Sequence, residues 1–587
     1  MRPWRRVGDG EWVGTDASER FPIYTRGNAG EVYPEVYRPL SFSIAQQAGE
    51  QAMRNAILSS GIIRPDELDA IPLSTGIGSG VFGGYAYLNL SVQRLVAARV
   101  PGGSWSDADN SFLGAGDPPP HVPLAIEKNR RAGVAGLRYL WRQSGVTELP
   151  QLALDQRIVD EFLAGLPDPS TAADHDLRNS MLGVTELFMP MFETHLKVSF
   201  AASALMAVLT QLCEKQLGNA ELAVRLVSGL GDVDSAAPSI ALWLLGRKVA
   251  ASDSLTAEFD VGVAGVWDRL QVSTEAAEFN EKFRQFIADF GSRGPNEWDT
   301  AFDTWETDPE LALAFVDRMR LTDESHAPTT QGDRLALERR TLETDVMSRL
   351  RWPTKRLFSR VLVATRLHMQ SRERTKTTVV RAIHGARLQG QELDRRLAAR
   401  SGGERGDLWF LVEEELDGYV ADPASCAPQI AERRELLTEL QRRIPPFYFE
   451  GEQPPVDTWE LRSTQVPQVV VGEVLTGLAG CAGVATGRAR VVTNPGDPRG
   501  LEPGDVLIAP LTDPSWTPLF VPAEAVIVDV GAVMSHAIIV SRELGIPCAV
   551  SVTDATRRIP DGALVEVDGG AGTVRILELP RLTAMTD

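Results

Sequence analysis

The segment Ala525–Val550 constrains the fold of this chain more than any other part of the sequence. It opens with the apolar run AVIVDV and a glycine, after which Ser535 and His536 begin an amphipathic segment that closes at Gly545. A second apolar run follows at once. This pattern predicts a strand, a turn, a short helix and another strand, with His536 in the first turn of the helix.

A histidine at the start of a helix is suited to carrying a phosphoryl group. The free N–H groups and the helix dipole favour an anion at this position, and a neutral imidazole is a good nucleophile near neutral pH. These local features alone leave a second interpretation of His536 open, in which it is a capped, partly buried structural histidine.

Four motifs follow one another in the C-terminal part of the chain: GCAGVATGRARVV, PGDVLIAPLTDPSWTPLF, SHAIIVSRELGIPCAV and DGALVEVDGGAGTVRI. In this order they closely resemble the phosphohistidine swivelling domain of the phosphoenolpyruvate-utilising enzymes, and the rifampin phosphotransferase branch in particular. The resemblance implies that His536 is the phosphorylated residue. Met534 stands where the dikinase-type enzymes have a regulatory threonine, so we expect no control by phosphorylation at that position.

The segment Tyr24–Ile44 places Arg26 and Glu31 in a polar turn that is followed by aromatic residues. A polar cluster beside aromatic side chains can line a pocket, and a structural loop with an Arg–Glu pair is the alternative. The segment resembles the start of the acceptor-binding domain of rifampin phosphotransferases. Arg26 and Glu31 are therefore candidate substrate-binding residues.

His195 lies in a long stretch with helical periodicity, close to Glu193 and Lys197. A histidine beside polar residues can act as general base on a hydroxyl, and a histidine packed between helices is the alternative. His195 is therefore the second candidate catalytic residue, after His536.

Cationic residues in two other segments are candidates for binding phosphate or substrate. Arg293 and Glu297 lie in a Gly/Pro loop that resembles a Gly-His-Arg-Gly motif, with Ser292 in place of the histidine. The planar guanidinium fits phosphate oxygens, and a structural Arg–carboxylate pair is the alternative. Arg372 shares a helix face with Lys376, and a phosphate-transfer site needs such cations. A solvated helix face is the alternative.

The glycine-rich stretch Ser74–Tyr85 fits neither a phosphate loop nor a dinucleotide fingerprint, because no Gly-Lys-Ser/Thr follows and the spacing is wrong. We predict a flexible loop before a strand. Because no other segment resembles a nucleotide site, we predict that ATP and Mg²⁺ are supplied through a separate ATP-grasp subunit. We expect this chain to bind neither of them tightly and to hold no metal of its own.

The sequence predicts a multidomain α+β fold, in which a largely helical acceptor-binding region precedes a compact α/β phosphohistidine domain. The predicted parts are an N-terminal mixed part at 1–123, a helical domain at 124–443, a Pro-rich linker at 444–469 and the swivelling domain at 470–587. A Pro-rich linker is semi-rigid, which suits a carrier that visits two sites.

The net charge of −20 argues against nucleic acid or an anionic membrane surface as a partner. The apolar stretch near 200–212 is too short to span a bilayer, and the basic N-terminus lacks the apolar core of a signal peptide. The four scattered cysteines match no metal-ligand spacing, so we expect a reduced, cytoplasmic protein.

The predicted function is that of a phosphotransferase subunit. The resemblance, which extends to two-component enzymes of the phenylphosphate synthase type, implies that His536 takes a phosphoryl group from the ATP-grasp partner, with ATP converted to AMP and phosphate. It then passes the group to a hydroxyl of a small organic acceptor such as a phenol. One alternative is a non-catalytic phospho-carrier or scaffold with a degenerate acceptor site, which the substitution at Ser292 favours. Another is a component of a rifampin-like antibiotic phosphotransferase. Polar groups that converge in the helical region would favour catalysis over the scaffold.

Overall fold

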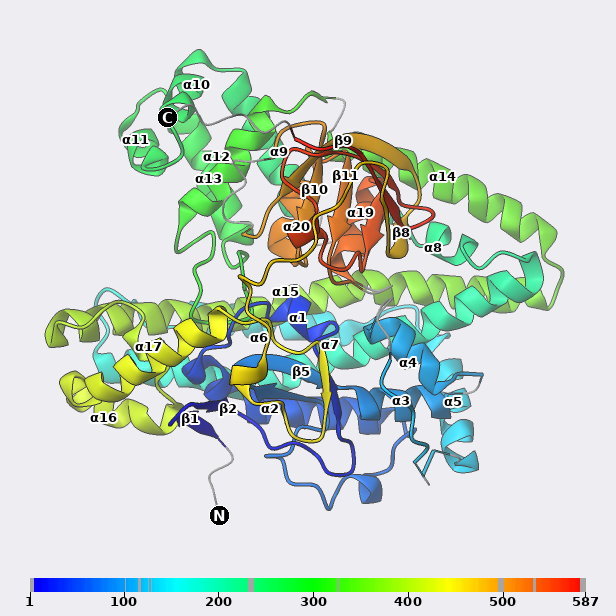
Figure 1. Ribbon diagram of the computed structural model, residues 1–587, viewed down its shortest axis with the longest axis horizontal. Helices are drawn as coiled ribbons and strands as arrows, with labels where there is room; N and C mark the ends of the chain where they lie inside the picture. The colour runs from blue at the N-terminus through cyan, green and yellow to red at the C-terminus, as the bar shows by residue number, and fades with distance from the viewer. Residues whose placement is uncertain are drawn as a thin grey trace.

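The computed structural model describes residues 5–100, 102–113, 118–124, 126–127, 129–230, 237–324, 327–494, 501–531 and 535–580. Its elements form two tiers (Figure 1). The lower tier contains long helices and a small antiparallel sheet, and the upper tier contains a larger sheet built from C-terminal residues. This arrangement confirms the predicted multidomain α+β fold.

Two long helices form the centre of the lower tier. Helices α7 (Asp174–Leu217) and α15 (Thr354–Ser401) pack along each other, and α2 (Pro39–Ser59) packs against α7. Among the described helices, α7 alone is long and apolar enough to cross a membrane by length and composition, and 39% of its apolar window is buried inside the protein. A core helix passes the same test, and the contacts of α7 with α2 and α15 fit that role.

The small sheet of the lower tier joins segments that are far apart in the sequence. Its strand order is β4-β5-β3-β6, with these strands at Ser79–Phe82, Tyr85–Asn89, Ile23–Thr25 and Tyr448–Glu450 respectively. Strand β6 pairs with β3 across more than four hundred residues of sequence. The N-terminal part and the helical region therefore share one core and do not form separate folded units.

Strand β6 corrects the predicted Pro-rich linker at 444–469. Phe449 and Trp459 are buried in the core of the lower tier, because burying large aromatic side chains is favourable even between prolines. The N–H of Arg462 donates to the carbonyl of Arg442 in the lower tier, and the N–H of Val469 already donates to the upper tier. The connection between the tiers is therefore reduced to residues 463–468.

The glycine-rich stretch 74–85 is a buried β-hairpin and not the flexible loop that the sequence predicts. Strands β4 and β5 are joined by Gly83 and Gly84, whose φ angles of 53° and 77° favour glycine. The carboxylate of Glu50 accepts hydrogen bonds from the N–H of Gly78 (3.1 Å) and from the preceding N–H (3.2 Å). A carboxylate thus occupies the backbone donors that a phosphate loop would offer.

An eight-stranded mixed sheet in the order β7-β14-β13-β9-β10-β11-β12-β8 forms the upper tier. Strands β9 to β12 run parallel, and the outer pairs are antiparallel. Every residue of β10 (Asp505–Ala509) and β11 (Ala525–Val528) is buried, as expected for parallel strands covered on both faces. Leu507 points to the face that carries α19 (His536–Leu544), and Ile508 points to the opposite face.

The predicted strand, turn, helix and strand around His536 are confirmed as β11, α19 and β12 (Cys548–Val550). Ile538 and Val540 of α19 are buried against the sheet. Gly545 ends the helix in the left-handed conformation, with φ of 69°. The position of Met534 lies outside the described residues.

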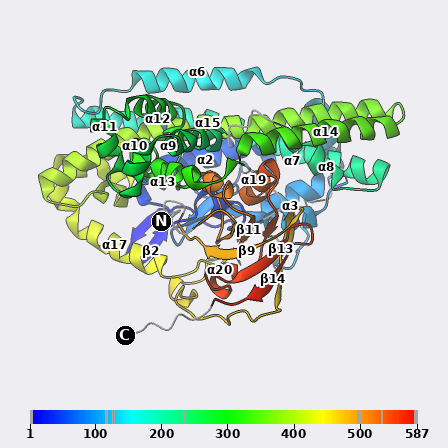
Figure 2. The ribbon, with the colours of Figure 1, turned by 90° about the horizontal axis from the view of Figure 1, so that it is seen from above.

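Helices on two sides hold the upper sheet over the lower tier (Figure 2). On one side, α9 (Ala237–Ala250) and α13 (Pro309–Leu321) share an apolar core with the sheet and with α18 (Thr517–Phe520). On the other side, α14 (Pro328–Arg349) contacts α19. The helical segment α9–α13 is thus packed against the C-terminal domain as well as joined to the lower tier.

The remaining strands are β1 (Arg6–Gly8), β2 (Glu11–Val13), β7 (Val474–Thr476), β8 (Leu478–Cys481), β9 (Val484–Val491), β13 (Leu564–Asp568) and β14 (Thr573–Glu578). The remaining helices are α1 (Ala29–Val32), η1 (Pro65–Glu67), α3 (Leu90–Arg99), α4 (Trp105–Phe112), α5 (Arg130–Gln143), α6 (Pro150–Gly165), α8 (Leu222–Leu226), α10 (Asp253–Asp260), α11 (Val266–Val272), α12 (Ala277–Phe290), η3 (Asp407–Phe410), η4 (Glu413–Glu415), α16 (Leu416–Ala421), η5 (Pro423–Cys426), α17 (Ala427–Gln441), η6 (Val456–Thr458), η8 (Pro514–Trp516) and α20 (Ala555–Arg558).

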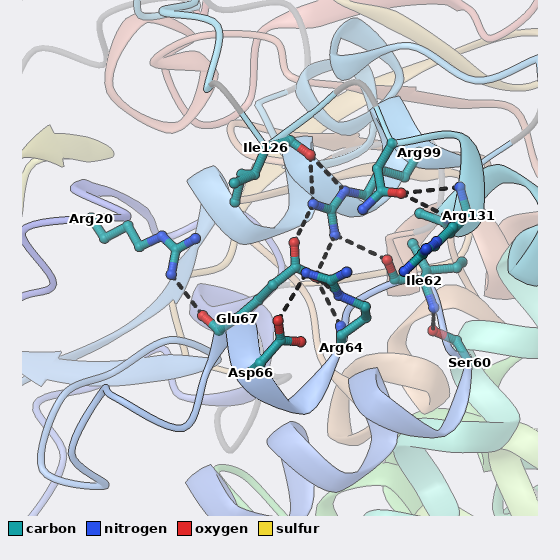
Figure 3. A network of polar contacts seen from close by, with 11 residues as sticks. Arg20, Ser60, Ile62, Arg64, Asp66, Glu67, Arg99, Ile126 and Arg131 are labelled. Carbon is teal, nitrogen blue, oxygen red and sulfur yellow. Dashed lines mark hydrogen bonds and ion pairs between the residues drawn. The ribbon is translucent and has the colours of Figure 1, made fainter.

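A buried guanidinium ties three segments of the lower tier together (Figure 3). Arg99, at the end of α3, donates to both carboxylate oxygens of Glu67 at 2.6 and 3.0 Å. It also donates to the carbonyls of Ile62 and Ile126. The Arg99 side chain is fully buried, and its hydrogen bonds hold the pKa of Glu67 below its usual value.

Replacing Arg99 by methionine should destabilise this part of the fold strongly, because the Glu67 carboxylate is left buried without its partner. We expect a loss of about 3–5 kcal/mol in the free energy of local opening, measured by native-state amide hydrogen exchange in α3. Asp66→Asn is the control, since Asp66 is largely exposed in its pair with Arg64; we expect a change within about 0.5 kcal/mol. Equal protection in the two variants would contradict the prediction.

Candidate active site

The candidate site forms where the first turn of α19 meets the lower tier. The backbone N–H of His536 donates a hydrogen bond of 3.1 Å to Oε2 of Glu31. Glu31 belongs to α1, which lies directly below the C-terminal domain (Figure 1). Ser535 is the N-cap residue of α19 but gives no side-chain cap. The Glu31 carboxylate therefore satisfies one of the free N–H groups at the start of this helix.

Two threonine hydroxyls hold the ring of His536. Thr512 Oγ1 lies 3.1 Å from Nδ1, and Thr517 Oγ1 lies 3.1 Å from Nε2. Phe520 packs edge-on against the ring, with the centroids 6.0 Å apart. Because a threonine hydroxyl can donate or accept, both ring nitrogens are satisfied in a neutral imidazole.

Three cations face His536: two from helix α15 and one from the loop between α12 and α13. Arg293 and Lys376 are ion-paired to the same buried carboxylate, that of Glu297, at 2.9 and 3.6 Å. Arg372 lies one helical turn before Lys376 on α15. Burial first, and then the positive charges of Lys376, Arg293 and Arg372, lower the pKa of His536 well below its usual value. The imidazole is therefore neutral at physiological pH, which is its nucleophilic form.

The structure brings together five of the predicted substrate-binding and catalytic positions from four separate segments: His536, Glu31, Arg372, and the loop residues Arg293 and Glu297. A neutral nucleophile that faces several cations in a desolvated site suits a group that becomes an anion when modified. Phosphorylation of His536 would place the negative charge among Lys376, Arg293 and Arg372.

Arg26 is not part of this group, and its predicted role in substrate binding is corrected. Its guanidinium donates to the carbonyls of Ala86, Tyr33 and Pro34 at 3.1 to 3.3 Å. It also lies over the ring of Tyr85, 4.8 Å from the centroid. Arg26 thus supports the backbone around α1 from below, between three carbonyl groups and the ring of Tyr85.

His195 lies next to the site but is a weak base. Its Nδ1 is 3.1 Å from the hydroxyl of Thr375 on α15. Burial, together with the charges of Arg372 and Lys376, lowers the pKa of His195 to about 3. An imidazole with this pKa stays neutral throughout the physiological range and has little tendency to accept a proton.

Two further carboxylates, one buried and one partly buried, lie near α19. Burial raises the pKa of Asp513 to about 6, although Ser515 donates to it from both N–H and hydroxyl. Burial raises the pKa of Glu543, near the end of α19, to about 7, although the N–H groups of Gly229 and Leu230 donate to it. Docking of the C-terminal domain therefore desolvates acids at both ends of α19.

Sequence reasoning missed the two threonines as site residues. It placed Lys376 on the same helix face as Arg372 by its i, i+4 spacing, but named only Arg372 as a candidate. Thr512 and Thr517 lie within the motif PLTDPSWTPLF, which is one of the motifs that carry the family resemblance. The sequence of a loop does not show where its hydroxyl groups point. Only the fold shows that both hydroxyls reach the ring of His536.

The chain matches two family models. Residues 501–572 match the mobile domain of PEP-utilising enzymes, and residues 194–373 match the fourth domain of rifampicin phosphotransferase. The segment around His536 is thus similar to the mobile domain of PEP-utilising enzymes, and the C-terminal domain is called the mobile domain below. The predicted resemblance to the phosphoenolpyruvate-utilising enzymes is thereby confirmed.

Curated relatives match different shares of the chain. The prodigiosin synthesizing transferase PigC of Serratia marcescens is 26% identical over 98% of this chain and 65% of its own length. A rifampicin phosphotransferase of Streptomyces sviceus is 29% identical over 80% of this chain and 54% of its own length. One from Bacillus subtilis is 35% identical over 30% of this chain and 19% of its own length. The chain thus spans less than two thirds of the length of these relatives. The match to PigC includes both the C-terminal domain and the lower tier.

Proposed function

We propose that this chain is the phosphohistidine-bearing component of a phosphotransferase, in which His536 carries the phosphoryl group. The observation that carries the proposal is the neutral imidazole of His536, held by two hydroxyls and facing Arg293, Lys376 and Arg372. A structural histidine has no need of three cations whose charges disfavour its own protonation. A phosphorylated histidine needs them, because they stabilise the moving phosphoryl group.

In this proposal the structure corresponds to the delivery state. The mobile domain is docked on the lower tier, so that the group on His536 faces the acceptor site. Lys376 and Arg293 balance the phosphoryl charge, and Glu297 keeps the two cations in place between transfers. The connection at 463–468 lets the domain leave this position to be loaded elsewhere.

Loading in this proposal comes from an ATP-grasp subunit. That partner binds ATP and Mg²⁺, transfers the β-phosphoryl group to His536 and releases AMP and phosphate. Support comes from the hairpin at 74–85, where Glu50 occupies the N–H groups of Ile77 and Gly78, which makes this glycine-rich segment poorly suited to binding a nucleotide. We propose a cytoplasmic location with no nucleic-acid or membrane partner, which the net charge and the free cysteines favour.

The acceptor we propose is the hydroxyl of a small aromatic compound such as a phenol. Aromatic residues extend from Glu31 towards His195: Tyr33 lies 6.5 Å from Trp298, and His195 lies 6.1 Å from Trp298, between ring centroids. The buried Nε1 of Trp298 makes no hydrogen bond within the described residues. Planar rings with one free donor suit a planar hydroxylated ligand.

A rifampin-like antibiotic is the second candidate acceptor, because two of the relatives are named rifampicin phosphotransferases.

The scaffold interpretation is less well supported. Charged groups from α1, α15 and the loop before α13 converge on His536, and a degenerate site would not keep them buried and paired.

The test of the proposed loading is incubation with ATP labelled at the β- or the γ-phosphoryl group, with and without a purified ATP-grasp protein. We expect His536 to take the β-label only when that protein is present, and AMP to be the product. Labelling of His536 by the chain alone would contradict the separate subunit. Label from the γ-position with ADP as product would contradict the dikinase-type step.

A further inference from the structure

We infer that Glu31 is the general base that takes the proton from the acceptor hydroxyl while the phosphoryl group leaves His536. This inference rests on the proposed function and assigns a catalytic residue to it. Glu31 comes from the acceptor side of the site, whereas the phosphoryl group arrives on the mobile domain. The base is therefore already in place when the domain docks.

The contacts of Glu31 leave one carboxylate oxygen available for a substrate. Oε2 accepts the N–H of His536 at 3.1 Å. Oε1 makes no hydrogen bond to any residue that the structure describes. Arg372 and Lys376 of α15 and Asp513 of the mobile domain are the charged groups that face the carboxylate, besides the first turn of α19. The free oxygen thus lies beside the first turn of the phosphoryl-bearing helix.

The local backbone holds Glu31 in this position. Asn28, which precedes α1, has a φ of 65° and so turns the chain sharply. The backbone at Gly30 lies close to the Arg26 guanidinium, since a Cβ added at Gly30 would be 3.3 Å from it. The buried guanidinium of Arg26 thus supports the residue next to Glu31. A base on a rigid support has the geometry that proton transfer in a transition state requires.

Burial tunes Glu31 to accept a proton near neutral pH. It raises the pKa of Glu31 to about 7, even though His536 N–H, Arg372 and Lys376 favour the ionised form. A general base works best when its pKa lies close to the working pH. The neighbouring groups are less suitable. His195 has a pKa of about 3, Asp513 already accepts two hydrogen bonds from Ser515, and Glu297 is ion-paired with two cations.

The inferred step balances. The phosphoryl group is bound to one ring nitrogen of His536, and the other ring nitrogen carries a proton and is held by a threonine hydroxyl. The acceptor oxygen attacks phosphorus, the P–O bond forms and the P–N bond breaks. The proton of the acceptor hydroxyl moves to Glu31, and His536 leaves as a neutral imidazole. Glu31 returns its proton to solvent after the domain undocks.

The experiment loads His536 chemically with phosphoramidate, so that no partner is needed, and then follows transfer to phenol and to 4-nitrophenol. The test variant is Glu31→Gln, whose amide oxygen still accepts the N–H of His536 but takes up no proton. We expect transfer to phenol to slow by about 10²–10⁴-fold. Transfer to 4-nitrophenol above its pKa should be nearly unchanged, because that acceptor has already lost its proton.

The pH profile provides a readout that a positioning role would not change. With Glu31 in place, the rate of transfer to phenol should rise with pH to a plateau above about 7, since only the ionised carboxylate accepts a proton. Glu31→Gln should lack this rise. Glu543→Gln is the matched control, because Glu543 is a partly buried carboxylate near the far end of α19 whose pKa burial raises to a similar value. It should affect both acceptors equally.

Equal slowing of both acceptors by Glu31→Gln would overturn the inference and leave Glu31 as a docking residue. If Asp513→Asn slows transfer to phenol but not to 4-nitrophenol, and Glu31→Gln slows neither, the base is Asp513. That result would also overturn the inference. If neither phenol takes the group, hydrolysis of phospho-His536 is compared in the same variants, and equal hydrolysis overturns the inference. Failure to load His536 would count against the proposed function and not against Glu31.

Discussion

His536→Asn should leave the chain folded and abolish both the uptake and the transfer of a phosphoryl group. The asparagine amide can still bond to Thr512 or Thr517, and the buried apolar residues of α19 are unchanged, so the domain should keep its structure. The amide has no nucleophilic nitrogen, and the covalent route is lost with it. We expect no transfer above the background of the reaction without protein, with the thermal unfolding midpoint within a few degrees of the unmodified chain.

The control for this variant is His175→Asn. His175 is exposed at the start of α7 and lies in a different tier from the mobile domain. Phosphoramidate can reach its ring freely, so His175→Asn should remove adventitious labelling and leave transfer unchanged. Transfer that survives in His536→Asn and disappears in His175→Asn would contradict the assignment.

Lys376→Met should slow transfer from phospho-His536 by about 10²–10³-fold, because it removes one preorganised positive charge from a desolvated phosphoryl site. Lys376 lies at the contact between the tiers, ion-paired to Glu297 at 3.6 Å. Chemical loading of His536 happens while the mobile domain is undocked and should proceed normally. The loss should therefore fall on the transfer step alone, measured as the rate at which phospho-His536 disappears in the presence of phenol.

Two controls separate the charge of Lys376 from its structural role. Lys248→Met removes a lysine that is paired to Glu278 on the surface, and it should leave the transfer rate unchanged. The double variant Lys376→Met with Glu297→Gln also removes the buried negative charge. Any part of the slowing that comes from an unbalanced carboxylate should therefore disappear in it. A transfer rate of Lys376→Met within a factor of two of the unmodified chain would show that Lys376 does not contact the phosphoryl group.

The sequence predicts the C-terminal domain well, because its signals are local. The apolar runs of β10 and β11, the helix that starts at His536 and the glycine that ends it all lie within one short segment. Apolar runs and helix ends depend on residues that are close together in the sequence, so they can be predicted from the local sequence alone.

The lower tier is harder to predict because its contacts are distant in sequence. Strand β6 pairs with β3, and the Phe449 that anchors it lies in a stretch whose prolines indicate a linker. No local pattern predicts a partner strand more than four hundred residues away. The helical segment α9–α13 likewise packs on the C-terminal sheet, which periodicity within those helices does not show.

The site shows the same difference. Residue types identified Glu31, Arg293 and Arg372 as candidates, and the fold places their charges around His536. Residue type also suggested Arg26, only five residues before Glu31, yet its side chain points under α1 and away from the site. The direction of a side chain in a turn depends on backbone angles such as the φ of Asn28, which the sequence does not reveal.

The most direct test of the account is to treat the purified chain with phosphoramidate, locate the phosphoryl group by mass spectrometry and then add phenol. The account predicts that the phosphoryl group is on His536 and that it leaves as phenyl phosphate at a rate that depends on Lys376 and Glu31. A phosphoryl group on a different residue, or one on His536 that passes to phenol no faster than from a free histidine, would contradict it.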